Sequence, residues 1–429
     1  MATSLSTTGG RTRRRYGARH RWVVLAVGVG AQGSFSAMFS GIPVTGIAMR
    51  SGYHLSTGEL GLVLACLGLG VAVSDIVWGL LTDRFGDRRI LLVGLTSTGA
   101  LLALMAAAFT PGDGAGVVAL AACLLAAGAL GGSVNGASGR AIMTWFADGE
   151  RGLAMSIRQT AIPAGGAVGV ALLPWLAGSY GFHAVYAALA ALCLLAAAAT
   201  WRWLHEPTMH PARAADDATA AADATAGTEA AAVTKAAGRS PLLRWDMWRV
   251  ALASALLTVP QFAVLSFTAI FLHDVKGEGA ALASATVVIA QIGGGAARIW
   301  TGRRTDRRGN RRTYLRGIGA LTGVAMAAAA VLTAAPTPVA VTALALGGLL
   351  ANSWHGVAYT EIAAMAGAAR AGTALGLEGT TVFAATFLTP LLIPVVLAAA
   401  SWEAVWMLAA VAALLAVPLA PGQKGVTAR

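Results

Sequence analysis

The feature that most constrains this chain is a series of twelve apolar runs, each about 20 residues or longer. A helix rises about 1.5 Å per residue, so about 20 residues cross a hydrocarbon core about 30 Å thick. Unpaired backbone groups are too costly in lipid, so each run must be a helix or a strand of a closed barrel. Barrel strands alternate apolar and polar residues over about ten positions, and these runs do not. The predicted helices are residues 22–47, 57–81, 90–109, 117–142, 153–177, 182–204, 248–272, 281–303, 314–334, 338–362, 372–398 and 402–420.

The composition supports an all-α membrane protein. Apolar residues make up 57% of the 429 residues and charged residues 12%, whereas ordinary globular domains carry about 25% charged residues. So few charges cannot cover a water-facing surface. Cys66, Cys123 and Cys193 all fall inside predicted helices, so we interpret them as packing residues and not as disulfides. The first apolar run is too long for a cleaved signal peptide and follows an Arg-rich leader, as in an uncleaved signal anchor.

The net charge of +12 reports topology. With both termini in the cytoplasm, 26 of the 31 basic residues fall on the cytoplasmic side, two fall outside (Arg50 and Lys276), and three lie within helices. This asymmetry is the positive-inside rule. We therefore expect contact with anionic lipid head groups and not with nucleic acid.

The twelve spans divide into two sets of six. Residues 206–246 between them are rich in Ala, Thr and Asp and lack a sustained apolar pattern, so we predict a cytoplasmic linker, mostly disordered, with a short interfacial helix near 242–245. The predicted divisions are an N-terminal tail (1–21), a first six-helix bundle (22–205), the linker (206–246), a second bundle (247–420) and a C-terminal tail (421–429).

An internal repeat relates the two halves. Residues 79–89 read GLLTDRFGDRR and residues 302–312 read GRRTDRRGNRR, at an offset of 223, and both follow the second span of their half. Repeats of this kind are common in transporters, where the substrate site lies at the repeat interface near the bilayer midplane.

These motifs resemble the signature loop of the major facilitator superfamily (MFS), and the resemblance extends over about residues 20–205 and 245–420. It implies two six-helix bundles around a central cavity and transport by alternating access. The glycines permit close helix approach and a tight turn. Asp83 can meet a helix N-terminus or an Arg of a neighbouring helix, and Arg140 is a plausible partner. The predicted gating residues are Gly79, Asp83, Arg84, Gly86, Arg88, Arg140, Gly302, Asp306, Arg307 and Gly309. The alternative is that these loops serve folding and topology only.

Charged residues within the spans cost about 2.5–3.5 kcal/mol each on insertion scales and usually face a cavity or a partner. Besides Arg140, the repeat pairs Asp75 with Arg298 (offset 223) and Arg158 with Glu378 (offset 220). In the functional interpretation Arg158 binds an anionic group of the substrate, and Glu378 or Asp75 takes up a coupling proton, because burial favours the protonated carboxyl. In the structural alternative these charges form fixed salt bridges between helices, and we favour a structural role for Arg298 and Arg140.

Neutral polar residues mark a candidate cavity. In the superfamily that the chain resembles, the first, fourth, seventh and tenth helices line the central cavity. On these helices the predicted substrate-binding residues are Gln32, Asn135, Gln261, Asn352, His355 and Tyr359. Residues 145–166 are loosely similar to superfamily branches that move small organic anions, although residues 162–166 partly echo the fifth-helix motif of drug exporters.

The sequence therefore predicts a secondary transporter in the cytoplasmic membrane of a bacterium, moving a small anionic or polar organic solute, with proton symport as the leading mechanism. The alternatives are a proton antiporter that exports a drug or secondary metabolite, and a non-transporting sensor with the same fold. The Gly28-x-Gly30-x-x-Gly33 pattern lies within a span and is a packing motif. We find no phosphate-binding loop, zinc motif or nucleophile turn, so we expect no enzymatic activity, cofactor or metal. We also expect a monomer.

Overall fold

The computed structural model describes residues 19–111, 115–205 and 239–422. The predicted N-terminal tail lies almost wholly outside these ranges, as do residues 206–238 of the predicted linker and most of the C-terminal tail. The described residues are helical, with no strand, and contain twelve helices long and apolar enough to cross a membrane. The prediction of an all-α protein with twelve spans is confirmed.

The first bundle contains six spans and one short helix, α2. Its helices are α1 (His20–Val44), α2 (Gly46–Gly52), α3 (Thr57–Phe85), α4 (Asp87–Ala108), α5 (Val117–Gly131), α6 (Ser133–Trp145), α7 (Asp148–Tyr180) and α8 (Phe182–Trp203). The second bundle starts with the short 3-10 helix η2 (Pro241–Leu243), where a helix near 242–245 was predicted. Its other helices are α11 (Trp245–Asp274), α12 (Ala280–Arg308), α13 (Arg311–Val331), α14 (Thr337–Ala351), α15 (His355–Ala366), α16 (Ala371–Ala399) and α17 (Trp402–Leu419).

Two spans predicted as continuous are broken in the middle. The fourth is α5 followed by α6, with Gly132 at the junction, and the tenth is α14 followed by α15, with residues 352–354 between them. The two breaks are 220 residues apart and so belong to the internal repeat. A break releases backbone carbonyl groups from the helix ladder, and such groups are tolerated at membrane depth only where protein covers them.

The predicted helix ends are wrong at three places that bear on function. Helices α3 and α12 continue to Phe85 and Arg308, so Asp83 and Asp306 lie in the last turns of helices and not in loops. Gly86 (φ 89°) and Gly309 (φ 62°) end these helices in a conformation that favours glycine. Helix α7 begins at Asp148 and not at residue 153, so Arg158 lies ten residues from its start, about 15 Å along the axis.

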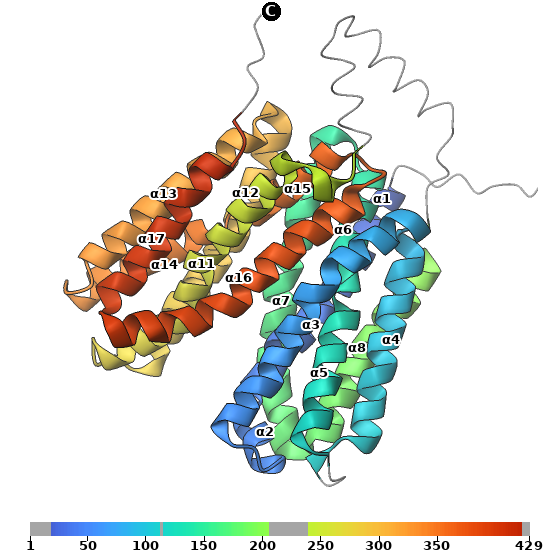
Figure 1. The fold of residues 1–429 in the computed structure, drawn as a ribbon, viewed down its shortest axis with the longest axis horizontal. Helices are drawn as coiled ribbons and strands as arrows, with labels where there is room; N and C mark the ends of the chain where they lie inside the picture. The colour runs from blue at the N-terminus through green and yellow to red at the C-terminus, as the bar shows by residue number, and fades with distance from the viewer. Residues whose placement is uncertain (1–18, 112–114, 206–238, 423–429) are drawn as a thin grey trace, which may run out of the picture.

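The bundles meet along two crossings that the repeat relates. Helix α3 packs on α16, and α12 packs on α7. In Figure 1 the bundles converge at the upper end, near the labels α15 and α1, and their lower ends lie apart. We call the upper end, which carries the α3–α4 and α12–α13 turns, the motif end.

Apolar side chains on the outer surface are consistent with a lipid environment. Large apolar residues such as Leu62, Val73, Val288, Ile292 and Leu346 are more than half exposed, which a water-soluble monomer rarely tolerates over large patches. Inside, Asp75, Arg158, Arg298 and Glu378 are 0–2% exposed. The polar groups of this protein are thus concentrated between the helices.

Candidate functional site

Arg158 of α7 lies at the centre of the polar interior and is surrounded by neutral acceptors. Its Nε donates to Ser138 Oγ at 2.7 Å, and one terminal nitrogen, Nη1, donates to Gln159 Oε1 at 3.0 Å and to Met155 Sδ at 3.8 Å. The other, Nη2, donates to Gln32 Oε1 at 2.8 Å and to the backbone oxygen of Asn135 at 2.6 Å. A guanidinium has five N–H groups, so every donor of Arg158 is engaged.

Asn135 and Gln32 connect Arg158 to Asp75. Gln32 Nε2 donates to Asn135 Oδ1 at 3.1 Å, and Asn135 Nδ2 donates to the two carboxylate oxygens of Asp75 at 3.2 and 3.1 Å. All three side chains are less than 5% exposed. Their helices α1, α6 and α3 belong to the first bundle, so this half of the site is built within one bundle.

Arg298 of α12 is a second buried arginine, and it belongs to the second bundle. Its Nε donates to the Asn352 backbone oxygen, which the break after α14 releases, and Nη2 donates to Asn352 Oδ1 at 2.9 Å. Its Nη1 donates to the Gln159 backbone oxygen at 3.0 Å. Gln159 therefore contacts both buried arginines and joins the two bundles.

Glu378 of α16 is completely buried and faces α11. Its Oε1 accepts a hydrogen bond from Ser254 Oγ at 2.8 Å, and its Oε2 has no partner in the structure. His355 stacks on Trp354 at 3.8 Å between ring centroids and on Tyr359 at 6.4 Å. Gln261 Oε1 and His355 Nδ1 are buried without hydrogen-bond partners, so these two predicted residues have capacity for a ligand.

The ion pairs among the described residues include none of the four interior charges. In the described conformation, Asp75, Arg158, Arg298 and Glu378 therefore do not form the fixed salt bridges of the structural alternative. Sequence reasoning could not decide this point, because a buried guanidinium can be satisfied either by carboxylates or by amides, hydroxyls and backbone oxygens. The ionic alternative does hold for Arg140, nearer the motif end.

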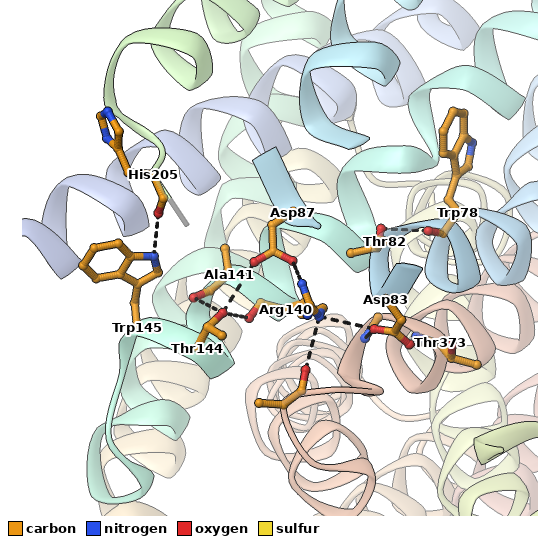
Figure 2. Close-up of polar contacts among 12 residues, drawn as sticks. Trp78, Thr82, Asp83, Asp87, Arg140, Ala141, Thr144, Trp145, His205 and Thr373 are labelled. Carbon is orange, nitrogen blue, oxygen red and sulfur yellow. Dashed lines mark hydrogen bonds and ion pairs between the residues drawn. The ribbon is translucent and has the colours of Figure 1, made fainter. Parts of the chain in front are cut away.

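Asp83 joins the bundles at the motif end (Figure 2). Its carboxylate accepts hydrogen bonds from the backbone N–H groups of Gly372 and Thr373 at 2.8 Å each and from Thr373 Oγ1 at 2.6 Å. These N–H groups belong to the first turn of α16, where backbone donors are free and the helix dipole favours an anion. We call this contact the first latch.

Arg140 supports the first latch from α6. Its Nε lies 3.3 Å from Asp83 Oδ1, as the sequence predicts, and also donates to the Ala368 backbone oxygen at 3.2 Å. A terminal nitrogen lies 2.6 Å from Asp87 Oδ1. Asp87 was missed as a site residue, although it follows Gly86 directly in the motif. The counterpart of Asp87 in the second half is Asn310. The triad of Asp83, Arg140 and Asp87 therefore occurs in one half only.

Asp306 forms the second latch. It accepts hydrogen bonds from the backbone N–H groups of Gly152 and Leu153, near the start of α7, at 2.8 Å each. Arg311 lies 3.3 Å from its carboxylate. The two latches are related by the internal repeat, since Asp83 corresponds to Asp306 and Gly372 to Gly152.

Glycines bring the backbones together at both latches. A Cβ added at Gly79 would lie 2.4 Å from the Gly372 backbone oxygen, and one added at Gly302 would lie 2.4 Å from that of Gly152. The other predicted gating residues are peripheral: Arg84 lies over the Phe85 ring, Arg88 donates to the Trp201 backbone oxygen, and Arg307 is exposed. No cluster of metal-ligating side chains occurs among the described residues.

The geometry defines a multi-pass membrane protein of two six-helix bundles with a buried polar centre and paired contacts at one end. The family model described as Major Facilitator Superfamily matches residues 29–377, and the chain belongs to this superfamily of transporters.

Known proteins match the chain over all or part of its length. It is 29% identical over 401 residues to an uncharacterized MFS-type transporter of Mycobacterium tuberculosis, covering 94% of this chain and 85% of the relative. It is 24% identical over 170 residues, 40% of this chain and 37% of the relative, to the probable galactarate/D-glucarate transporter GudP of Bacillus subtilis. The solved proton:xylose symporter XylE shares the fold with a TM-score of 0.73 at 17% identity, over 94% of this chain and 95% of that one.

Proposed function

We propose that this protein is a proton-coupled symporter of a small organic anion, with Arg158 as the anchor for the anionic group. The observation that carries the proposal is the neutral surroundings of Arg158 and Arg298, whose hydrogen bonds go to amides, hydroxyls and backbone oxygens. An anion can replace such partners without breaking an ion pair, and it adds charge–charge attraction and bidentate geometry to the hydrogen bonds that the guanidinium donates.

The proton would be carried by Asp75 or Glu378. Both carboxyl groups are buried and neither lies in an ion pair, so uptake of a proton does not leave a cation unpaired. Glu378 has one oxygen without a partner, and Asp75 is connected to Arg158 through two amides. The similarity to a probable galactarate/D-glucarate transporter supports an anionic substrate.

Alternating access would use the two latches. In the described conformation they join the bundles at the motif end, and the opposite ends lie apart in Figure 1. The excess of basic residues around the motif turns makes that end cytoplasmic under the positive-inside rule. The described conformation is then closed to the cytoplasm of a bacterial cell, with both termini on the cytoplasmic side.

Topology can be tested by reporter fusions. Fusions in the turns after Asp83 and after Asp306 are expected to report the same, cytoplasmic side, because both turns lie at the motif end. A fusion near residue 115, just before α5, should report the outside. Fusions after Asp83 and Asp306 that report opposite sides would contradict the topology.

Transport can be tested in proteoliposomes with an imposed pH gradient, using organic acids and cationic drugs as solutes. Wild type is expected to accumulate an anion when the outside is acidic. Arg158→Ala should weaken this uptake about ten- to a hundredfold, because hydrogen bonds to a charged group contribute about 1.5–3 kcal/mol. Arg202→Ala, an exposed arginine of α8, is the matched control and should transport as wild type does.

Each of the other outcomes would favour a different function or a different binding residue. Anion uptake by Arg158→Ala equal to that of wild type would show that Arg158 is not the anchor. Extrusion of a cationic drug in exchange for protons would favour an exporting antiporter. Absence of transport for every solute in both gradient directions would favour a sensor.

A further inference from the structure

In the described conformation all five N–H donors of Arg158 are used, so an anion must displace a partner before it can bind. We propose that Gln32 and Asn135 form a two-amide relay through which protonation of Asp75 releases the Arg158 guanidinium for the substrate. This inference rests on the proposed function, since it assumes a proton and an anion. It assigns a positioning role to the two amides, which the sequence predicts only as direct substrate ligands.

The relay is a continuous chain of four side chains. It runs from the Asp75 carboxylate to Asn135 Nδ2, from Asn135 Oδ1 to Gln32 Nε2, and from Gln32 Oε1 to Arg158 Nη2, with donor–acceptor distances of 2.8 to 3.2 Å. Each of the four side chains is less than 5% exposed, so water does not compete for these hydrogen bonds.

The two ends of the relay dictate the orientation of both amides. A carboxylate only accepts hydrogen bonds and a guanidinium only donates them. Asn135 must therefore turn its NH₂ group toward Asp75, and Gln32 must turn its oxygen toward Arg158. The oriented amides stabilise the charged forms at both ends, because buried hydrogen bonds in a chain polarise one another.

Protonation of Asp75 reverses the orientation of both amides. A carboxylic acid can donate its O–H, and on Asn135 only Oδ1, not the NH₂ group, can accept it. If Asn135 turns its oxygen toward Asp75, its NH₂ group faces that of Gln32. Gln32 must then turn as well, which presents its NH₂ group to Arg158, so the Arg158–Gln32 hydrogen bond is lost. One proton is gained as an O–H bond at Asp75, no other covalent bond changes, and one guanidinium N–H becomes free for an anion.

Asn135 is the hydrogen-bond partner of the Asp75 carboxyl among the described residues, and the nearby Ser74 hydroxyl donates to the Val71 backbone oxygen. A Cβ added at Gly132 would lie 2.7 Å from Asp75 Oδ1, and one added at Gly379 would lie 2.1 Å from Oδ2, so these glycines enclose the carboxyl without offering a side chain. Helices α1 and α5 bring no charged group near it.

The other ionisable groups around Asp75 either have partners of their own or stand at the far end of the relay. On α6 and α4, Arg140 and Asp87 pair with each other nearer the motif end. On α16, Glu378 is bonded to Ser254. Arg158 on α7 and Tyr359 on α15 interact with Asp75 through space, and Arg158 is the far end of the relay.

The relay sets the sign of coupling. Proton binding at Asp75 raises the affinity of Arg158 for an anion, and by linkage the anion raises the affinity of Asp75 for the proton. This is the sign that symport requires. A purely structural network would contribute to folding without linking the two binding events.

The test measures the pH dependence of anion affinity by exchange in proteoliposomes at pH about 6 and about 8, with radiolabelled D-glucarate, L-lactate and benzoate as probes. For wild type we expect affinity on the order of tenfold weaker at the higher pH, within the usual range of coupling. Gln32→Met removes the acceptor at Arg158, and Asp75→Asn supplies a neutral donor to Asn135. Both variants should show the same affinity at the two pH values and should lose proton-driven accumulation.

Ser34→Ala is the matched control, because Ser34 lies on the same helix, is buried, and bonds to the backbone oxygen of Ala31. It should keep the wild-type pH profile. Gln32→Glu has nearly the shape of Gln32 and replaces Gln32→Met in the test if that variant does not fold. Its carboxylate would hold Arg158 in an ion pair and weaken anion affinity at both pH values.

The outcomes separate the relay from the proposed function. A Gln32→Met protein with the wild-type pH dependence, or a Gln32→Glu protein with wild-type affinity, overturns the relay and leaves proton–anion symport standing. Wild type that neither exchanges nor accumulates any of the three probes overturns the proposed function and the relay with it.

Discussion

Replacing Asp83 by alanine is expected to reduce proton-driven uptake at least tenfold while the protein is still made and inserted. The variant loses three hydrogen bonds from the start of α16 and the contact with Arg140. A hydrogen bond to a charged group contributes about 1.5–3 kcal/mol. Loss of even one such contribution changes the balance between two conformations by at least about tenfold.

Two measurements check this prediction. Uptake is assayed in cells at equal membrane abundance. Opening of the motif end is assayed with a membrane-impermeant maleimide applied from that side, which labels a cysteine introduced at Ala371, a buried residue beside the first latch. The Asp83→Ala background should label faster than wild type. Uptake at the wild-type rate would contradict a gating role and favour a role in topology alone.

Asp306→Ala is the comparison that the repeat provides. The second latch has two backbone hydrogen bonds and Arg311, but no counterpart of the Thr373 hydroxyl bond, because Leu153 stands at that position. We therefore expect a smaller loss of uptake in Asp306→Ala than in Asp83→Ala. The double variant should be the most open, since both contacts hold the same end of the molecule closed.

The twelve spans, the two halves and the place of the latches could be predicted from sequence because each rests on a periodic or repeated pattern. Lipid demands about 20 apolar residues per span, and the repeated motif marks equivalent turns. The partners of Asp83 and Asp306 could not be predicted, because they are backbone N–H groups of Gly372, Thr373, Gly152 and Leu153. A backbone donor exists at every residue except proline and has no signature in the sequence.

The buried charges show a second limit of sequence analysis. The sequence identifies Asp75, Arg158 and Arg298 as costly groups in a membrane, but their partners depend on how helices from distant parts of the chain rotate about their axes. Gln159 illustrates this point: its position beside Arg158 is visible in the sequence, yet its contact with Arg298 exists only because α7 packs on α12. The breaks at Gly132 and Asn352 were missed, although Gly, Ser and Asn residues gather at both places, because each run as a whole is long and apolar enough to be one span.

Replacing Gly79 by alanine is expected to impair transport nearly as much as loss of Asp83, although it removes no polar group. The added Cβ would lie 2.4 Å from the Gly372 backbone oxygen and 3.0 Å from its carbonyl carbon, so α3 and α16 must move apart by several tenths of an ångström or more. The hydrogen bonds of Asp83 to the start of α16 are 2.8 Å long and weaken steeply when stretched or misaligned. The first latch would then fail to close.

Gly30→Ala is the matched control, since a Cβ at Gly30 would meet no atom within 4 Å and alanine favours the helix by about 1 kcal/mol over glycine. It should insert and transport as wild type does. Uptake and cysteine labelling of the motif end distinguish the two variants, with Gly79→Ala slow in uptake and open to label. Equal uptake by both would mean that the α3–α16 crossing separates freely, and that backbone contact at this crossing does not control access.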